Sequence, residues 1–155
     1  MNNKSELFYN SGQSLFELLG AIAVIGIILI AIVGLSTKSI SNSTSSRNST
    51  QASRLSQEAL EWLRIERDTD WNTFVAHGSA NGATICLDAL DWGNLGTCGT
   101  NEFISNTQFK RQVVLTYNPS VDPNSLEADI TTTWASGANI SVSKSTTLLT
   151  NWKNK

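Results

Sequence analysis

The stretch that decides the fold reads SGQSLFE at residues 11–17 and LLGAIAVIGIILIAIVGL at residues 18–35. The second part carries no charge, and Glu17 is the only charged residue between Glu6 and Lys38. As a helix, residues 18–35 extend about 27 Å, close to the hydrocarbon thickness of a bilayer. The sequence therefore predicts a membrane-spanning helix with a single carboxylate at its N-terminal end.

That carboxylate is costly. A charged side chain costs roughly 2.5–3.5 kcal/mol at the bilayer centre, and less near the bilayer edge. An ionisable residue in such a place usually serves a function and meets an opposite charge. Glu17 is therefore the first candidate functional residue of the chain.

Three interpretations of the apolar run compete. A cleaved secretory signal needs a basic start, a shorter apolar region and a small-residue cleavage site. Here Lys4 is the only basic side chain upstream, and no Ala-x-Ala site follows the run. A plain transmembrane anchor explains the length but not the spacing of Gly12 and Glu17. The third interpretation is proteolytic processing after Gly12, which explains both features.

Gly12 and Glu17, followed by the apolar run, resemble the processing site of type IV prepilins and type II secretion pseudopilins. In that family a short polar leader ends in Gly, a peptidase cuts after it, and Glu stands fifth in the mature chain. The resemblance implies a leader at residues 1–12, cleavage before Gln13, and Glu17 as the fifth mature residue. Major pilins commonly start with Phe, so Gln13 favours a minor pilin or pseudopilin and leaves N-methylation open.

The resemblance also implies a mechanism and partners. The new α-amine of Gln13 would meet Glu17 of a neighbouring subunit and set the filament register, because a misplaced pair leaves buried charges unpaired. The partners implied are other subunits, the prepilin peptidase, an inner-membrane platform protein, an assembly ATPase and, before assembly, membrane lipid. Gly26 matches a helix-weakening Gly of the family, and Gly34 stands where a Pro often stands.

The predicted transmembrane helix, which the resemblance makes the filament core, covers residues 13–35. It is followed by a polar segment, residues 36–67, which is predicted to continue the helix. Ser, Thr and Asn fill residues 36–50 except at three positions, so a flexible linker is the alternative to a continuous helix. Helical periodicity returns at Gln51 and runs to about Arg67. It predicts an apolar face that covers a sheet, formed by Ala52, Leu55, Ala59, Trp62 and Leu63.

Residues 68–155 are predicted to form an extracytoplasmic loop region and an antiparallel sheet. Residues 71–108 show no clear period except a short strand at residues 84–87. Cys86 and Cys98 lie beyond the apolar run, where an oxidising compartment favours a disulfide, and two free buried thiols are the alternative.

Alternating patterns predict three strands after this region. The first strand runs from Phe109 to Asn118, the second carries Ala128, Ile130, Thr132 and Trp134 on one face, and the third runs from Asn139 to Leu149. Ile140 and Val142 are predicted to point inward, and Ser136 to Asn139 to form the hairpin turn. The fold class is therefore α+β: a long N-terminal helix on a small, three- to four-stranded antiparallel sheet, as in pilins.

The composition argues against other functions. The net charge is −2 without a basic cluster, so nucleic acid is not an expected partner. One His, no Gly-rich phosphate loop and no Cys/His metal cluster predict neither an enzyme nor a bound metal or cofactor.

Charge does not decide the orientation of the span. The resemblance implies a cytoplasmic N-terminus, an extracytoplasmic C-terminal domain and later a place in a filament. The alternative function is a membrane-anchored extracytoplasmic binding domain that never polymerises.

Overall fold

The computed structural model describes the backbone of residues 11–154 and the side chains of residues 15–153. Most of the predicted leader lies outside the described residues. The elements follow in chain order: α1 (Ser11–Thr69), α2 (Trp71–Val75), β1 (Ala83–Cys86), β2 (Asn94–Leu95), β3 (Phe109–Thr116), β4 (Ser125–Ser136), β5 (Asn139–Thr150) and a 3₁₀ helix (Trp152–Asn154). The chain divides into two compact units between Thr44 and Ser45, and α1 contributes to both.

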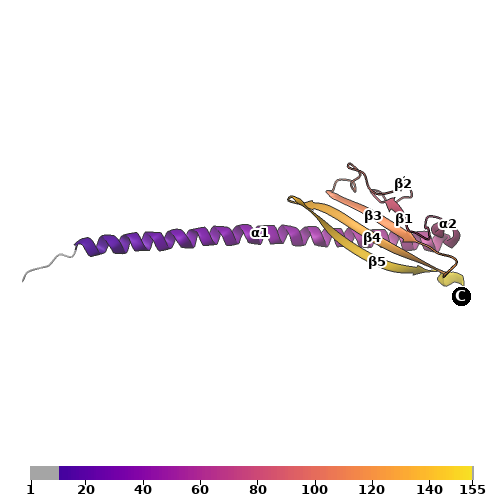
Figure 1. The fold of residues 1–155 in the computed structure, drawn as a ribbon, viewed down its shortest axis with the longest axis horizontal. Coiled ribbons are helices and arrows are strands. Elements are labelled where there is room, and N and C mark those ends of the chain that lie inside the picture. The colour runs from indigo at the N-terminus through magenta and orange to yellow at the C-terminus, as the bar shows by residue number, and fades with distance from the viewer. Residues whose placement is uncertain (1–10, 155) are drawn as a thin grey trace, which may run out of the picture. The chain divides into compact units, whose positions relative to one another are not determined.

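The second unit contains one antiparallel sheet, with strand order β2-β1-β3-β4-β5 (Figure 1). One edge strand, β2, has two residues, and the other, β5, has 12. The predicted α+β class, with a long N-terminal helix packed on an antiparallel sheet, is confirmed. The sheet has five strands rather than three or four because the two-residue strand β2, which was not predicted, pairs with β1.

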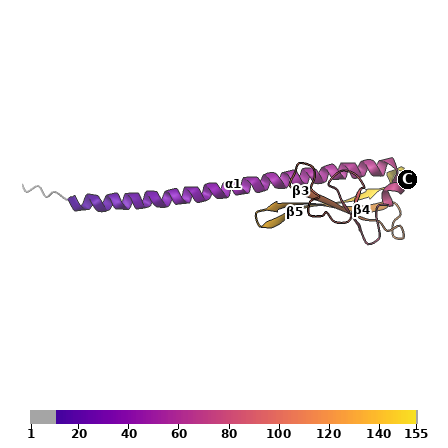
Figure 2. The same ribbon diagram turned by 90° about the horizontal axis from the view of Figure 1, so that it is seen from above.

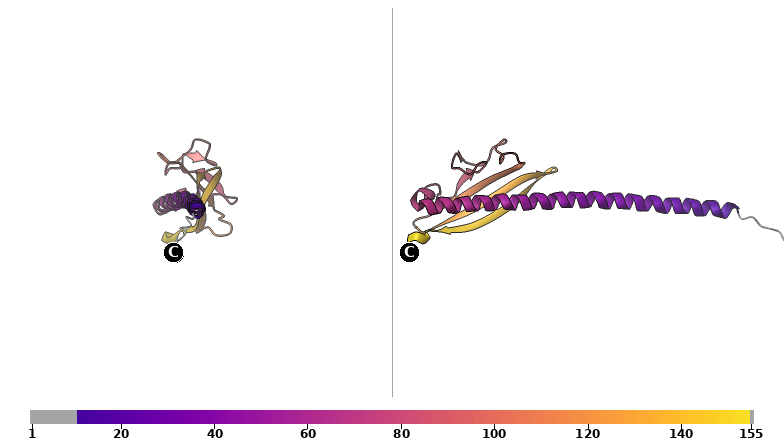
Figure 3. Two further views of the ribbon diagram at one scale, coloured as in Figure 1. Left: turned by 90° about the vertical axis from the view of Figure 1, so that its left-hand side faces the viewer. Right: turned by 180° about the vertical axis from the view of Figure 1, so that it is seen from behind.

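Small side chains let the second half of α1 approach the sheet, along one face of which it lies (Figures 2 and 3). The residues that face the sheet are at most 1% exposed and are spaced by four, three and four positions: Ala52, Ser56, Ala59 and Leu63. The hydroxyls of Ser56 and Thr132 lie 2.8 Å apart and share a hydrogen bond. Ser56 was not part of the predicted apolar face, whereas Leu55 and Trp62, which were, are only partly buried.

The predicted faces of β3 and β4 are confirmed. Alternate residues of both strands are buried against α1, including Phe109, Val113, Ile130 and Trp134. Strands β3 and β4 pair without interruption from Phe109↔Trp134 to Thr116↔Glu127. The alternation of side chains therefore places one face of each strand in a common core.

The predicted orientation of β5 is wrong. Ile140 and Val142 were expected to point inward, but they are 76% and 57% exposed. The hairpin fixes this register, since β4 and β5 are joined by a two-residue loop in which Gly137 has a φ of 62°. Asn139 pairs with Ser136, so the odd-numbered residues of β5, three of them serines, share the face of Trp134 and Thr132.

The segment after α1 is more regular than predicted. α1 ends at Thr69, two positions beyond the expected end, and α2 follows at once. Asp70 is the N-cap of α2, and its Oδ1 accepts a hydrogen bond of 3.1 Å from the Thr73 amide. The predicted strand at residues 84–87 is found one position earlier, as β1.

Candidate functional site

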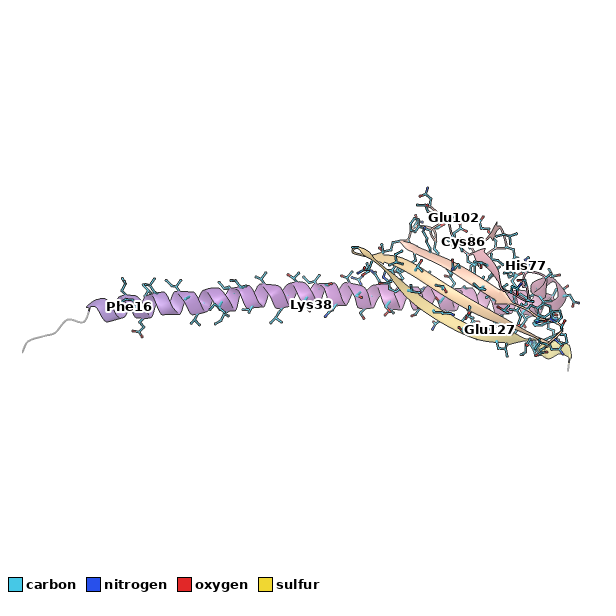
Figure 4. All side chains as sticks on the ribbon, in the orientation of Figure 1. Phe16, Lys38, His77, Cys86, Glu102 and Glu127 are labelled. Carbon is cyan, nitrogen blue, oxygen red and sulfur yellow. A yellow bond between two sulfur atoms is a disulfide. The ribbon has the colours of Figure 1, made fainter. Side chains whose placement is uncertain are left out.

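The first part of α1 carries a continuous apolar surface. From Leu15 to Leu35 its large apolar side chains are between 50% (Ile28) and 77% (Phe16) exposed. Figure 4 shows side chains along this part of the helix on both visible sides. The richest window has a mean hydropathy of 3.0, which makes α1 a candidate membrane span. A soluble surface rarely exposes this much apolar area, so lipid or other apolar helices must cover it.

Glu17 lies near the start of this apolar helix, and its side chain is exposed. Gln13 precedes it by four positions in α1, which places the two residues one helical turn apart on one face. The side chain of Gln13 lies outside the described range. Cleavage after Gly12 and the pairing of the Gln13 amine with Glu17 therefore stay predictions.

The two candidate flexible positions lie within unbroken helix. α1 continues through Gly26 and Gly34, and an added Cβ at either glycine would meet no atom within 4 Å. Each glycine lowers the stability of a helix by about 1 kcal/mol relative to alanine. Their role in helix flexibility stays a prediction. That role requires both a helical and an unwound state of the segment, and the structure contains the helical one.

The hydroxyl-rich segment of α1 is helical, as predicted. Ser36 and Thr37 donate hydrogen bonds of 2.9 and 3.0 Å to the carbonyls of Ile32 and Val33, four positions earlier. Thr50 makes the same bond to Ser46. These bonds satisfy three of the segment's hydroxyl groups within the helix, so those three do not require it to unwind.

A buried arginine connects α1 to the sheet. Arg111 on β3 is 2% exposed, and its guanidinium donates to the carbonyls of Leu55 and Leu87 at 2.8 and 3.2 Å. Its Nη1 also lies 3.3 Å from Glu58 Oε2. Burial lowers the pKa of Arg111, and the charge of Glu58 opposes that shift. Arg111 stands in the same alternating row of β3 as Phe109 and Val113, but the sequence did not predict its burial or these partners.

The predicted disulfide between Cys86 and Cys98 is present, and their Cα atoms are 4.8 Å apart. Cys86 ends β1, and the bond attaches the loop after β2 to the sheet (Figure 4). The Glu102 carboxylate lies within 4.8 Å of both sulfur atoms. Both sulfurs are bonded to each other, so these three residues do not form a metal site in this state.

The aromatic residues of the segment after α1 form part of the core. Phe74 is buried, and Trp92 stacks on His77, with ring centroids 3.9 Å apart and ring planes 5° from parallel. Trp92 Nε1 donates a hydrogen bond of 2.8 Å to Glu66 of α1. His77, the one histidine of the sequence, is therefore half-buried against an indole ring.

Two aspartates near β2, Asp88 and Asp91, accept hydrogen bonds. Asp88 accepts a hydrogen bond from the Asn94 side chain at 2.9 Å, and Asp91 accepts one from the Gly93 amide at the same distance. Both bonds hold the turn around β2. Within residues 15–153, Cys86, Cys98 and Glu102 are the only three His, Cys, Asp or Glu side chains at metal-binding spacing.

Comparisons with protein-family models, curated proteins and solved structures found no match to this chain. The fold and the apolar helix define its class: an α+β protein with one long N-terminal helix that is a candidate membrane span. Among the described residues, both a candidate membrane span and the predicted disulfide are present.

Proposed function

We propose that this protein is a structural subunit, a minor pilin or pseudopilin, of a type IV pilus-like or type II secretion-like filament. It is cleaved after Gly12 and assembles through the apolar part of α1. The observation that carries the proposal is the position of Glu17. It stands five residues after Gly12, at the start of an apolar helix that continues into a helix packed on a sheet.

Processing gives Glu17 a partner. Cleavage frees the α-amine of Gln13, whose reference pKa of about 7.7–8.0 leaves much of the population positively charged at neutral pH. In a bundle of apolar helices, that amine of one subunit meets the Glu17 carboxylate of a neighbour. A shifted register leaves both charges buried and unpaired, which costs several kcal/mol. The charge pair sets the register, while the apolar surface of α1 supplies the affinity.

The rest of the chain suits this role. The second half of α1 holds the sheet through small residues and Arg111, so the domain is carried on the same helix that assembles. The disulfide suits a domain exposed to an oxidising compartment.

Mass spectrometry of the protein from the membrane fraction tests the processing step. The mature chain is expected to begin at Gln13, and Gly12→Leu is expected to retain the leader. An intact start at Met1, or a cut near Ser36, would contradict the proposal. In either case the chain would be a membrane-anchored or released domain that does not polymerise.

Glu17→Ala tests the register step separately. It is expected to leave cleavage intact while the amount of the protein in sheared filaments falls at least tenfold. Glu17→Asp, which keeps the charge, is expected to restore part of the loss. Assembly of Glu17→Ala at wild-type levels would rule out the charge pair.

A further inference from the structure

The free edge of the sheet at β5 is unusually open. Natural proteins blunt edge strands with short length, prolines, bulges or charges. β5 pairs with β4 over 12 positions without a bulge, contains no proline and carries one charge, Lys144. The opposite edge, β2, is only two residues long. Within the described residues, β5 is therefore the only edge long enough to pair with another strand.

The backbone groups that point out of this edge can be assigned. Residues flanking a two-residue hairpin loop form a hydrogen-bonded pair, so Asn139 directs its N–H and C=O toward β4. Asn151, just after β5, also directs its backbone toward the β4 side, since its amide donates a hydrogen bond of 2.9 Å to the Asn124 carbonyl. Odd-numbered residues of β5 therefore bond to β4. Even-numbered residues, Ile140 to Leu148, direct their backbone groups to the free edge.

A hollow adjoins this edge on the α1 side of the sheet. Its volume is about 550 Å³, and its lining includes Arg54, Gln57, Leu60, Glu61, Arg64 and Ser145. The inward row of β5 includes Ser141, Ser143 and Ser145, and these small side chains leave this space beside α1 open. A strand added to β5 would lie about 4.8 Å beyond it and would direct alternate side chains to this side of the sheet.

The lining of the hollow carries two arginines, Arg54 and Arg64, and two glutamates, Glu58 and Glu61. Glu61 pairs with Arg64 at 2.6 Å, and Glu58 pairs with the buried Arg111. Among the ion pairs of the described residues, none includes Arg54. Arg54 also lines the adjoining hollow along α1, which contains Arg47. We therefore expect an added strand to bind more tightly when one of its side chains on the α1 side of the sheet is acidic.

We propose that β5 and this hollow bind an extended segment of another polypeptide, which adds a sixth strand to the sheet. The segment alternates apolar residues with polar ones and presents an acidic side chain to Arg54. Its backbone bonds to the even-numbered residues of β5, and its outward side chains pack beside Val142 and Leu148, which are 57% and 62% exposed. This surface lies in the sheet-bearing unit and does not depend on filament assembly.

The test uses the full chain in detergent micelles and a labelled synthetic decapeptide of alternating valine and threonine with a central glutamate. A second peptide carries lysine in place of the glutamate. Fluorescence anisotropy is expected to show about fivefold tighter binding of the glutamate peptide. That ratio corresponds to the binding free energy of a partly exposed ion pair. Arg54→Glu is expected to reverse this preference, while the matched control Lys110→Glu, on the other side of the sheet, keeps it.

Val142→Pro tests the edge itself. It removes an N–H that points to the free edge and leaves the bonds to β4 intact, so peptide binding is expected to fall about tenfold with an unchanged melting temperature. Val142→Thr keeps the N–H and is expected to bind as wild type. Hydrogen exchange of the amides from Ile140 to Leu148 is expected to slow when the peptide binds.

Three results would overturn the proposal. The first is no binding of either peptide to the wild-type chain, and the second is binding that Val142→Pro does not weaken. The third is protection of the β5 amides that rises with protein concentration without peptide, which would assign the edge to a second copy of this chain. The processing of Gly12 is unaffected by any of these results.

Discussion

The guanidinium of Arg111 on β3 donates a hydrogen bond of 2.8 Å to the backbone carbonyl of Leu55 on α1. A helix carbonyl normally accepts only from its own helix, so this bond attaches the second half of α1 to the sheet. The same side chain also reaches the carbonyl of Leu87, beyond β1. One buried side chain therefore joins three segments that are distant in the sequence.

Arg111→Ala is expected to lower the free energy of unfolding by about 3 kcal/mol, because it removes three hydrogen bonds and leaves a cavity under α1. Arg111→Met, which keeps most of the side-chain volume, is expected to lose about half as much. Glu58→Ala is expected to change stability by less than about 1 kcal/mol, because Glu58 is 54% exposed. Urea unfolding of the full chain in micelles measures all three. An equal loss in Arg111→Ala and Glu58→Ala would contradict the structural role.

Trp134 offers a second test of the core. It is 6% exposed and packs on Phe109 and Ala52, but its Nε1 has no hydrogen-bond partner. An unpaired buried donor costs about 1–3 kcal/mol. Trp134→Phe removes the donor and part of the ring, so the two effects oppose each other and stability is expected to change by less than about 1 kcal/mol. Trp134→Ala is expected to lose about 3–5 kcal/mol. The same unfolding experiment separates the variants, and a large loss in Trp134→Phe would indicate a hidden partner for Nε1.

The sequence predicted correctly the features that depend on local periodicity. The α1 span, the faces of β3 and β4, the hairpin at Gly137 and the disulfide all follow from patterns within a few tens of residues. It failed where tertiary contacts decide. In the sequence, Ser56 interrupts the apolar face with a polar residue. In the structure its hydroxyl shares a hydrogen bond with Thr132, which is far away in the sequence. Nothing local reports that pairing.

The error at β5 has a similar cause. Ile140 and Val142 alternate as an apolar row, and hydrophobicity alone places such a row inside. The hairpin register places the serines inside instead, because the loop has two residues. For the candidate site, the spacing of Gly12 and Glu17 is visible in the sequence. The hollow beside β5 is not, because it depends on small inward side chains next to α1.

Asp129 makes part of the stability dependent on pH. Its carboxylate accepts a hydrogen bond from the Thr146 hydroxyl and lies 3.2 Å from Lys144 Nζ. These partners, Thr146 first, hold the pKa of Asp129 below its ordinary value of 3.8. The folded pKa is lower than the unfolded one, so the contribution is present above the unfolded pKa and is lost as the pH falls through the folded pKa. As the pH is lowered from about 6 to about 2.5, the melting temperature is expected to fall less steeply for Asp129→Asn than for wild type. Identical slopes would remove Asp129 from this role.

Removal of the disulfide is expected to weaken the sheet-bearing unit. The bond closes a loop with a sequence separation of 12, which the chain-entropy model values at about 3 kcal/mol. The double variant Cys86→Ala/Cys98→Ala is expected to lose about that much in urea unfolding, and added reductant is expected to affect wild type but not the variant. If reductant leaves wild type unchanged, the bond either resists reduction or contributes little, and the double variant distinguishes the two.

The glycines of the span give a test of helix flexibility. At Gly26 and Gly34 an added Cβ meets no atom within 4 Å, so alanine is expected to stabilise the isolated helix by about 1 kcal/mol at each position. If this segment unwinds during assembly, the double variant Gly26→Ala/Gly34→Ala resists that step and the yield of sheared filaments falls, while the amount in the membrane stays constant. Gly20→Ala is the matched control, because it has the same open surroundings but lies outside the segment between the two glycines. Equal yields for the double variant and wild type would show that α1 assembles as the continuous helix described here.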